Sequence, residues 1–168
     1  EIPENKFEIR IDRTAELTAQ GADKVTFLFS ANKNMMPRPI AEVASGGEIA
    51  RVMLALKALM GTRTSMPTII FDEIDTGVSG RVSDAMARMM KQMSSRQGQQ
   101  VIAITHLPQI AAQGEHHLFV YKENTDEQTL SHIRTLTEKE RITEVAHMLS
   151  GSDITQAAIE NAKQLLGK

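Results

Sequence analysis

The 168-residue sequence contains no cysteine and no tryptophan, and only 4% of its residues are aromatic. The lack of cysteine excludes disulfide bonds and thiolate metal ligands, and it is typical of a reducing compartment. There is no secretory signal, and no apolar run is long enough to cross a bilayer. The glycine-rich phosphate loop G-x-x-x-x-G-K-[ST] is also missing. We therefore expect a cytoplasmic protein that has no membrane partner.

Composition favours an ordinary globular protein. The length suits one compact domain with a substantial core, and 41% of the residues are hydrophobic. The net charge of −2 gives no overall attraction to nucleic acid or to an anionic membrane. Because the chain begins at Glu1 without an initiator methionine, we expect it to be part of a longer protein.

The first part of the chain predicts two strands. Residues 7–11 alternate apolar and charged side chains, and residues 24–29 are typical of a second strand. The turn signal at 20–23 between them favours an antiparallel pair. Residues 32–39 are expected to form a loop, because Pro37 and Pro39 disfavour regular structure.

The middle of the chain predicts a helix followed by a βαβ unit. Residues 49–60 carry apolar side chains at helical spacing, and Gly61 ends that pattern. Residues 68–71 and 101–104 are apolar throughout, which is typical of parallel strands buried on both faces. A second helical stripe over 82–93, rich in methionine and therefore interpreted as core, connects them.

The last part of the chain predicts a β-hairpin and two helices. Residues 117–122 and 129–136 are expected to pair around the polar turn at 123–127. Helices are expected over 138–149 and 154–166. Ser152 or Asp153 is the predicted cap of the second helix.

The segment Ser45-Gly46-Gly47-Glu48 opens the first helical pattern. Ser45 and Glu48 match a capping box, in which each side chain accepts from an otherwise unpaired amide. A capping box does not explain the two glycines, because each destabilises a helix by about 1 kcal/mol relative to alanine. Open amides at a helix N-terminus also bind anions. A structural cap and a phosphate contact are both left open.

Two acidic residues, Asp72 and Glu73, directly follow the apolar segment 68–71. Open α/β sheets place ligands at the carboxyl ends of their strands. An aspartate there commonly holds Mg²⁺, and a neighbouring carboxylate can deprotonate a water. His106 follows the next strand and is expected to lie beside them, although acidic residues and a histidine also end strands without any function. The remaining histidines show no metal-binding spacing and are interpreted as surface or packing residues: His116, His117, His132 and His147.

The order of these motifs is more specific than any single one. It resembles the C-terminal lobe of an ABC-type ATPase head, in which residues 45–48 form the signature motif and residues 69–73 form Walker B. Asp75 falls at the D-loop position and His106 at the switch histidine. Ala44 stands where many ABC ATPases have leucine.

Longer stretches resemble the RecN family of bacterial, SMC-like ATPases that repair double-strand breaks, within which Ala44 is not a departure. In SMC-like proteins a long coiled coil separates Walker A from the C-terminal lobe, which would account for the missing phosphate loop. The resembling stretches are FLFSAN at 27–32, PRP at 37–39, ASGGEIARVMLALK at 44–57, FDEIDTGVSG at 71–80 and ITHLPQ at 104–109.

The resemblance implies an α/β fold, the C-terminal half of an ABC/SMC-type P-loop ATPase head. A mainly parallel sheet with flanking helices would follow an antiparallel strand pair. Residues 1–44 would hold the strand pair and loop, and residues 45–168 would hold the motifs and closing helices. All of residues 1–168 would then form one lobe.

The resemblance also implies roles for the site residues, with ATP and Mg²⁺ as cofactors. Asp72 would hold Mg²⁺ through water, Glu73 would activate the hydrolytic water, and His106 would contact the γ-phosphate. Residues 45–48 would bind the nucleotide of the opposite head, and Asp75 would link the two active sites.

The implied partners are the protein's own Walker A lobe, a second head in a homodimer, and DNA ends reached through the full-length protein at the nucleoid. The chain alone is expected to be inactive. Two alternatives remain open. One is an ABC ATPase of another branch, such as a different SMC-like repair protein or a transporter subunit. The other is a non-catalytic dimerisation module, which the intact Glu73 disfavours.

Overall fold

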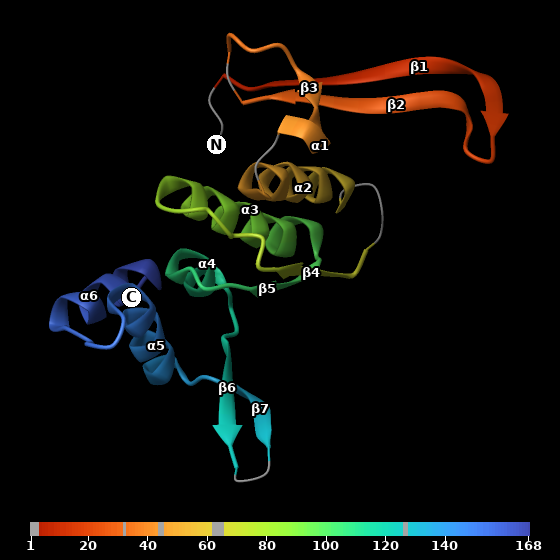
Figure 1. The fold of residues 1–168 in the computed structure, drawn as a ribbon. Helices are drawn as coiled ribbons and strands as arrows, with labels where there is room; N and C mark the ends of the chain where they lie inside the picture. The colour runs from red at the N-terminus through yellow and green to blue at the C-terminus, as the bar shows by residue number, and fades with distance from the viewer. Residues whose placement is uncertain (1–3, 32, 44–45, 62–65, 126–127) are drawn as a thin grey trace. The chain divides into compact units, whose positions relative to one another are not determined.

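The computed structural model describes residues 4–31, 33–43, 46–61, 66–125 and 128–168 (Figure 1). The chain forms two compact units, residues 1–55 and 56–168, and the helix α2 spans the boundary between them. The boundary that the sequence predicts between 44 and 45 lies outside the described residues. The elements are β1 (Lys6–Thr18), β2 (Gly21–Ser30), β3 (Arg38–Pro39), α1 (Ile40–Val43), α2 (Gly46–Gly61), β4 (Thr68–Asp72), α3 (Arg81–Gln97), β5 (Gln100–Ile104), α4 (Pro108–Gln113), β6 (Leu118–Asn124), β7 (Thr129–Thr135), α5 (Glu138–Ser150) and α6 (Gln156–Leu165).

The first unit contains the predicted antiparallel hairpin, β1 with β2. Its register pairs Ile9 with Phe27 and Ile11 with Val25, so these apolar side chains share one face. The rings of Phe7 and Phe27 stack with their centroids 5.9 Å apart. Ile9 and Ile11 are nevertheless 58% and 64% exposed, so the hairpin presents an apolar face to solvent in this chain.

Part of the predicted loop at 32–39 is instead a short strand. β3 pairs with β2 in antiparallel register through Leu28 with Pro39 and Phe29 with Arg38. Proline lacks an amide proton, but an edge strand tolerates it because its outer side needs no ladder bond. The prediction of a loop was therefore wrong at 38 and 39, while residue 32 lies outside the described part of the chain.

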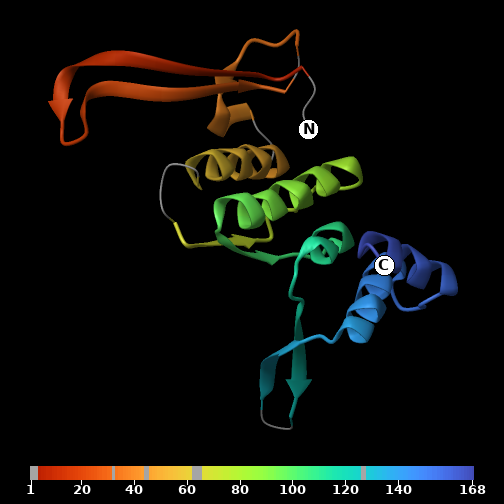
Figure 2. The same cartoon turned by 180° about the vertical axis from the view of Figure 1, so that it is seen from behind.

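The second unit contains the predicted βαβ unit, β4–α3–β5. β4 and β5 pair in parallel, with Ile69 opposite Val101 and Phe71 opposite Ala103. The connecting helix α3 lies along one face of this pair (Figures 1 and 2). The predicted methionine core of α3 is confirmed, and its buried members are Met86, Met90 and Met93.

The prediction that β4 and β5 are buried on both faces was wrong. Alternate residues of β4 are buried and exposed, and Ile70 on the open face is 63% exposed. Ile104 of β5 is 52% exposed. A continuous apolar run shows that both faces suit an apolar neighbour. In the described part of the chain, no apolar neighbour covers the face that carries Ile70.

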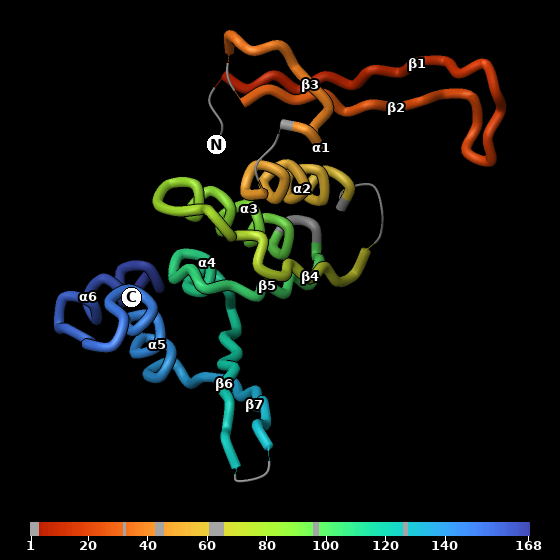
Figure 3. The backbone as a smooth tube through the Cα atoms, viewed as in Figure 1, coloured from red at the N-terminus to blue at the C-terminus, as the bar shows by residue number. Residues whose placement is uncertain are grey.

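The rest of the second unit runs from β5 through α4 into the predicted hairpin β6–β7 and then into α5 and α6 (Figure 3). Small residues on α4, α5 and α6 form a buried cluster in which the helices approach closely: Ala112, Val145, Ala146, Ala158 and Ala162. The predicted cap of α6 was wrong, because Thr155, and neither Ser152 nor Asp153, accepts from the amide of Ala158.

Arg141 of α5 joins α5 to the end of α4. Its guanidinium donates to the carbonyls of Ala111, Ala112 and Gly114 through Nη2 and to that of Glu115 through Nη1. These carbonyls lie at and just beyond the C-terminus of α4, where helical partners are missing. Burial lowers the pKa of Arg141, but a guanidinium stays charged in proteins.

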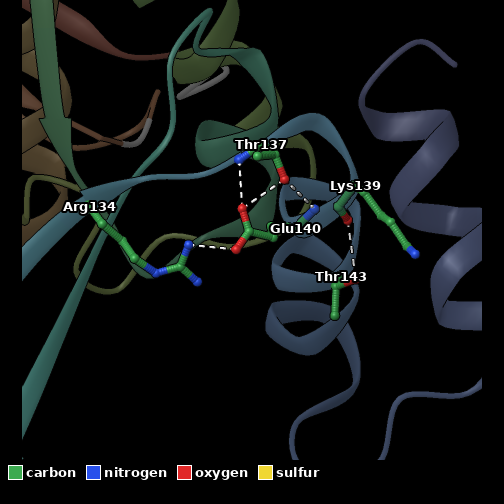
Figure 4. A network of polar contacts seen from close by, with 5 residues as sticks. All are labelled: Arg134, Thr137, Lys139, Glu140 and Thr143. Carbon is green, nitrogen blue, oxygen red and sulfur yellow. Dashed lines mark hydrogen bonds and ion pairs between the residues drawn. The ribbon is translucent and has the colours of Figure 1, made fainter.

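A capping box starts α5 (Figure 4). The Thr137 hydroxyl accepts from the Glu140 amide at 3.4 Å, and the Thr137 amide donates to Glu140 Oε2 at 2.9 Å. Arg134 of β7 reaches the other oxygen of that carboxylate at 2.6 Å. These bonds to Thr137 and Arg134 lower the pKa of Glu140 to about 2.

Candidate functional site

The candidate site lies where β4 and β5 end. Asp72 is the last residue of β4 and lies opposite Ile104, the last residue of β5. Glu73 follows, and its amide donates to the Ile104 carbonyl at 3.1 Å. The side chains of Asp72 and Glu73 are both exposed. The two strand ends are thus fixed to each other, and the acidic pair faces solvent at their edge.

Glu73 has a left-handed backbone with φ of +48°, which side chains rarely adopt. This conformation ends the extended strand and starts a tight turn. The amide and hydroxyl of Thr76 both donate to the Glu73 carbonyl, at 3.3 and 3.0 Å, and the amide of the buried Val78 donates to the Asp75 carbonyl at 3.0 Å. The turn directs the Asp75 side chain inward, where it is 1% exposed.

Asp75 connects this turn to the loop that follows β5. The Thr105 hydroxyl donates to Asp75 Oδ2. His106 Nδ1 lies 3.6 Å from Asp75 Oδ1, while the His106 side chain is 64% exposed. The predicted proximity of His106 to the end of β4 is therefore present in the structure, and Asp75 makes the contact.

The signature segment is described only in part. Ser45 lies outside the described residues, so the predicted capping box cannot be compared with the structure. α2 begins at Gly46, and Glu48 lies in its first turn. A Cβ atom built on Gly46 would meet no atom within 4 Å, so the backbone there is open to approach. Gly46, Gly47 and Glu48 belong to the first unit, while the strand-end residues belong to the second.

The described residues contain no group of three or more histidine, aspartate or glutamate side chains that could hold a metal ion by itself. The exposed Asp72 carboxylate still fits Mg²⁺, which is commonly held by one or two carboxylates together with waters and substrate phosphates. No helix among the described residues is long and apolar enough to cross a membrane. A shallow hollow between β6–β7 and α5, lined by residues such as Phe119 and Arg134, shares no residue with the site.

One residue of the site, Thr105, was not singled out from the sequence. Its hydroxyl both donates to Asp75 and accepts from the amide of Leu107 at 3.0 Å. A hydroxyl directly before the strand-end histidine was the available signal. Asp75 was expected to link two active sites across an interface. The structure gives its side chain partners within its own chain, and the link across an interface stays a prediction.

Comparison with known proteins identifies the class of fold first. No family model matches the chain. An SMC head domain with a coiled coil from Pyrococcus yayanosii covers 88% of this chain with a TM-score of 0.65 at 18% identity. A structure described under ATP-driven dimerisation and DNA-stimulated activation of SMC ATPases covers 90% of this chain and 85% of its own, with a TM-score of 0.59. The chain therefore shares its fold with SMC head structures, and it spans 26% of the first and 85% of the second.

Comparison with curated sequences then identifies a particular group of relatives. The DNA repair protein RecN of Halalkalibacterium halodurans is 40% identical over 98% of this chain, and that of Deinococcus radiodurans is 41% identical over 98%. RecN of Bacillus subtilis is 43% identical over 90%. The chain is therefore RecN-like over almost its whole length. It spans only 30%, 28% and 26% of these three relatives, respectively.

Proposed function

We propose that this chain forms the C-terminal lobe of an ATP-hydrolysing head in a RecN-like DNA repair protein. The observation that carries the proposal is the joined end of β4 and β5. There an exposed acidic pair and an exposed histidine lie at or just beyond the ends of neighbouring parallel strands, within a fold shared with SMC heads. That edge is where open α/β sheets bind their ligands.

Each residue at this edge has a separate role in the proposed hydrolysis. Glu73 is the general base, because its carboxylate is exposed at the strand end and can accept a proton from an attacking water. His106 contacts the γ-phosphate through its exposed side. Asp72 would hold Mg²⁺ through water, and the bound ion would neutralise charge on the phosphate oxygens. The hydrogen bond from the Glu73 amide to the Ile104 carbonyl joins the two strand ends that carry the carboxylate and the histidine.

The signature residues complete the site of a second head. Ser45 and the amides of Gly46 and Gly47 contact the γ-phosphate held by the opposing head, because amides at a helix N-terminus favour an anion and the space around Gly46 is open. Glu48, in the first turn of α2, belongs to the same segment that binds the nucleotide of the opposing head. Asp75 couples the two sites through the turn at 73–78. Hydrolysis separates the heads and so controls engagement of DNA ends in the cytoplasm, at the nucleoid.

A missing phosphate loop means that the chain needs a Walker A lobe from the rest of a RecN-like protein. The chain alone is expected to bind ATP more weakly than roughly 10 μM, because that loop supplies most nucleotide contacts. Calorimetry with ATP and Mg²⁺ measures this directly. Tighter binding by the chain alone would contradict the half-site proposal.

Substitution at Glu73 separates the ATPase from a non-catalytic dimerisation module. In a full-length protein that contains this chain, Glu73→Gln is expected to keep ATP binding and lower turnover by about 10²–10⁴-fold. Asp72→Asn is expected to weaken Mg²⁺-dependent binding instead. Glu16→Gln, at an exposed position of β1, is the matched control and should leave both unchanged. Equal turnover of Glu73→Gln and the unchanged protein would rule out the assignment.

A further inference from the structure

We propose that Asp75, together with Thr105, is a positioning residue that fixes the orientation and the protonated nitrogen of His106 within the same chain. The proposal rests on the proposed function only in so far as His106 contacts a phosphate there. It adds to the proposed coupling of two heads by Asp75 a role inside one head, because both of its carboxylate oxygens face groups of its own chain.

The Asp75 carboxylate is buried and only half satisfied. Oδ2 accepts from the Thr105 hydroxyl, whereas the buried Oδ1 has no hydrogen-bond partner among the described residues. A buried carboxylate oxygen without a donor is unfavourable, because it has given up its hydration. His106 Nδ1 lies 3.6 Å from that oxygen. A small rotation of the imidazole would complete the bond, and such bonds commonly tighten once the ligand is bound.

Thr105 determines the direction of this network. Its oxygen accepts from the amide of Leu107 at 3.0 Å, so its proton is left for Asp75. The same hydroxyl therefore bridges the residues on both sides of His106 and holds the backbone from which the imidazole projects. Because Oδ2 of Asp75 is taken by Thr105, only Oδ1 remains for the histidine.

The arrangement sets what His106 can offer to a ligand. A carboxylate oxygen accepts only, so Nδ1 must carry the proton that Oδ1 receives. Nε2 then lies on the side of the ring away from Asp75, on a side chain that is 64% exposed. A phosphate oxygen also accepts only, so Nε2 must donate to it. The imidazole is then positively charged, and the buried Asp75 carboxylate balances that charge, as the buried aspartate of a Ser-His-Asp triad does.

Nuclear magnetic resonance of ¹⁵N-labelled histidine tests the positioning without reference to ATPase activity. His106→Gln assigns the His106 ring signals among the five histidines of the chain. We expect a protonated Nδ1 in the unchanged protein and in Thr105→Ser, which keeps the hydroxyl. We expect Asp75→Ala to move the proton to Nε2, and we expect Thr105→Val to change the His106 ring signals, because the loop that carries His106 then loses its bond to Asp75. A ring that is protonated only at Nε2 in the unchanged protein would overturn the proposal, as would unchanged His106 signals in Thr105→Val. The near-isosteric Thr105 pair keeps the test decisive if Asp75→Ala does not fold.

Kinetics of the full-length protein test whether Asp75 acts through His106. Asp75→Ala is expected to lower kcat about 10–100-fold, the usual effect of removing a supporting partner, with little change in KM for ATP. Asp153→Ala, an exposed aspartate before α6, is the matched control. Combined with His106→Ala, the Asp75 substitution should have almost no further effect. Fully additive losses would overturn the proposal. An unchanged protein without ATPase activity would instead refute the proposed function, and the resonance measurement would still decide the positioning.

Discussion

Replacement of Arg141 should loosen the end of α4, which follows directly on the His106 loop. Arg141→Met keeps most of the aliphatic packing and removes all the donors to the carbonyls of Ala111, Ala112, Gly114 and Glu115. The contacts to Ala112 and Glu115 measure 2.9 and 3.2 Å, while that to Ala111 is long, at 3.4 Å.

The magnitude follows from these contacts. A hydrogen bond from a charged donor contributes about 1.5–3 kcal/mol, and three of these bonds share one nitrogen. The half-buried guanidinium is also partly hydrated in the folded state. We therefore count one to two full bonds and expect Arg141→Met to lower the free energy of unfolding by about 2–4 kcal/mol. Arg141→Lys keeps a point charge without the planar fork, so about half of that loss is expected.

Urea unfolding of the chain, followed by far-UV circular dichroism, measures this free energy. Arg88→Met is the matched control, because Arg88 is exposed on α3 and the same change there should stay within about 0.5 kcal/mol. If Arg141→Met unfolds within that same margin of the unchanged chain, the bonds to α4 contribute no net stability. The reasoning above would then be refuted.

Two further outcomes are expected. The pKa of Glu140 is lowered from 4.5 to about 2, so its ionised form stabilises the fold above pH 4.5, and this contribution is lost as the pH falls through about 2. Glu140→Gln should therefore lower the melting temperature at neutral pH and approach the unchanged chain near pH 2, and an equal difference at both pH values would contradict this. Met93 is 1% exposed, so Met93→Ala should destabilise the chain by about 2–5 kcal/mol in urea unfolding, while Met36→Ala, at an 85% exposed position, should change little. Equal effects of the two substitutions would show that the Met93 environment collapses around the smaller side chain.

Local sequence patterns predicted the elements well, because they depend on neighbouring residues. Alternation identified β1 and β2, and helical spacing identified α3 and its methionine core. The covered face of β4 could not be predicted, since Ile70 is as apolar as the buried Ile69 and only the tertiary structure distinguishes them. The cap of α6 was misplaced by two or three residues, because Ser152, Asp153 and Thr155 are all good capping residues.

The position of the candidate site could be predicted from the sequence, but the contacts between its side chains could not. The strand-end rule indicated Asp72, Glu73 and His106, because parallel strands end at one edge. The contact between Asp75 and His106 depends on a turn that starts from the left-handed backbone of Glu73. No residue pattern in the sequence predicts that left-handed conformation, since glutamate rarely adopts it. The roles of these residues in hydrolysis stay predictions.

The left-handed backbone of Glu73 also means that the stability of the turn and the presence of a carboxylate there oppose each other. A left-handed conformation disfavours any residue with a Cβ atom by about 1–2 kcal/mol, and glycine would relieve it. Glycine would make the turn easier to form and would remove the exposed carboxylate at the same step. Selection for stability alone would therefore favour glycine there, and under the proposed function the glutamate is stability given up for the general base.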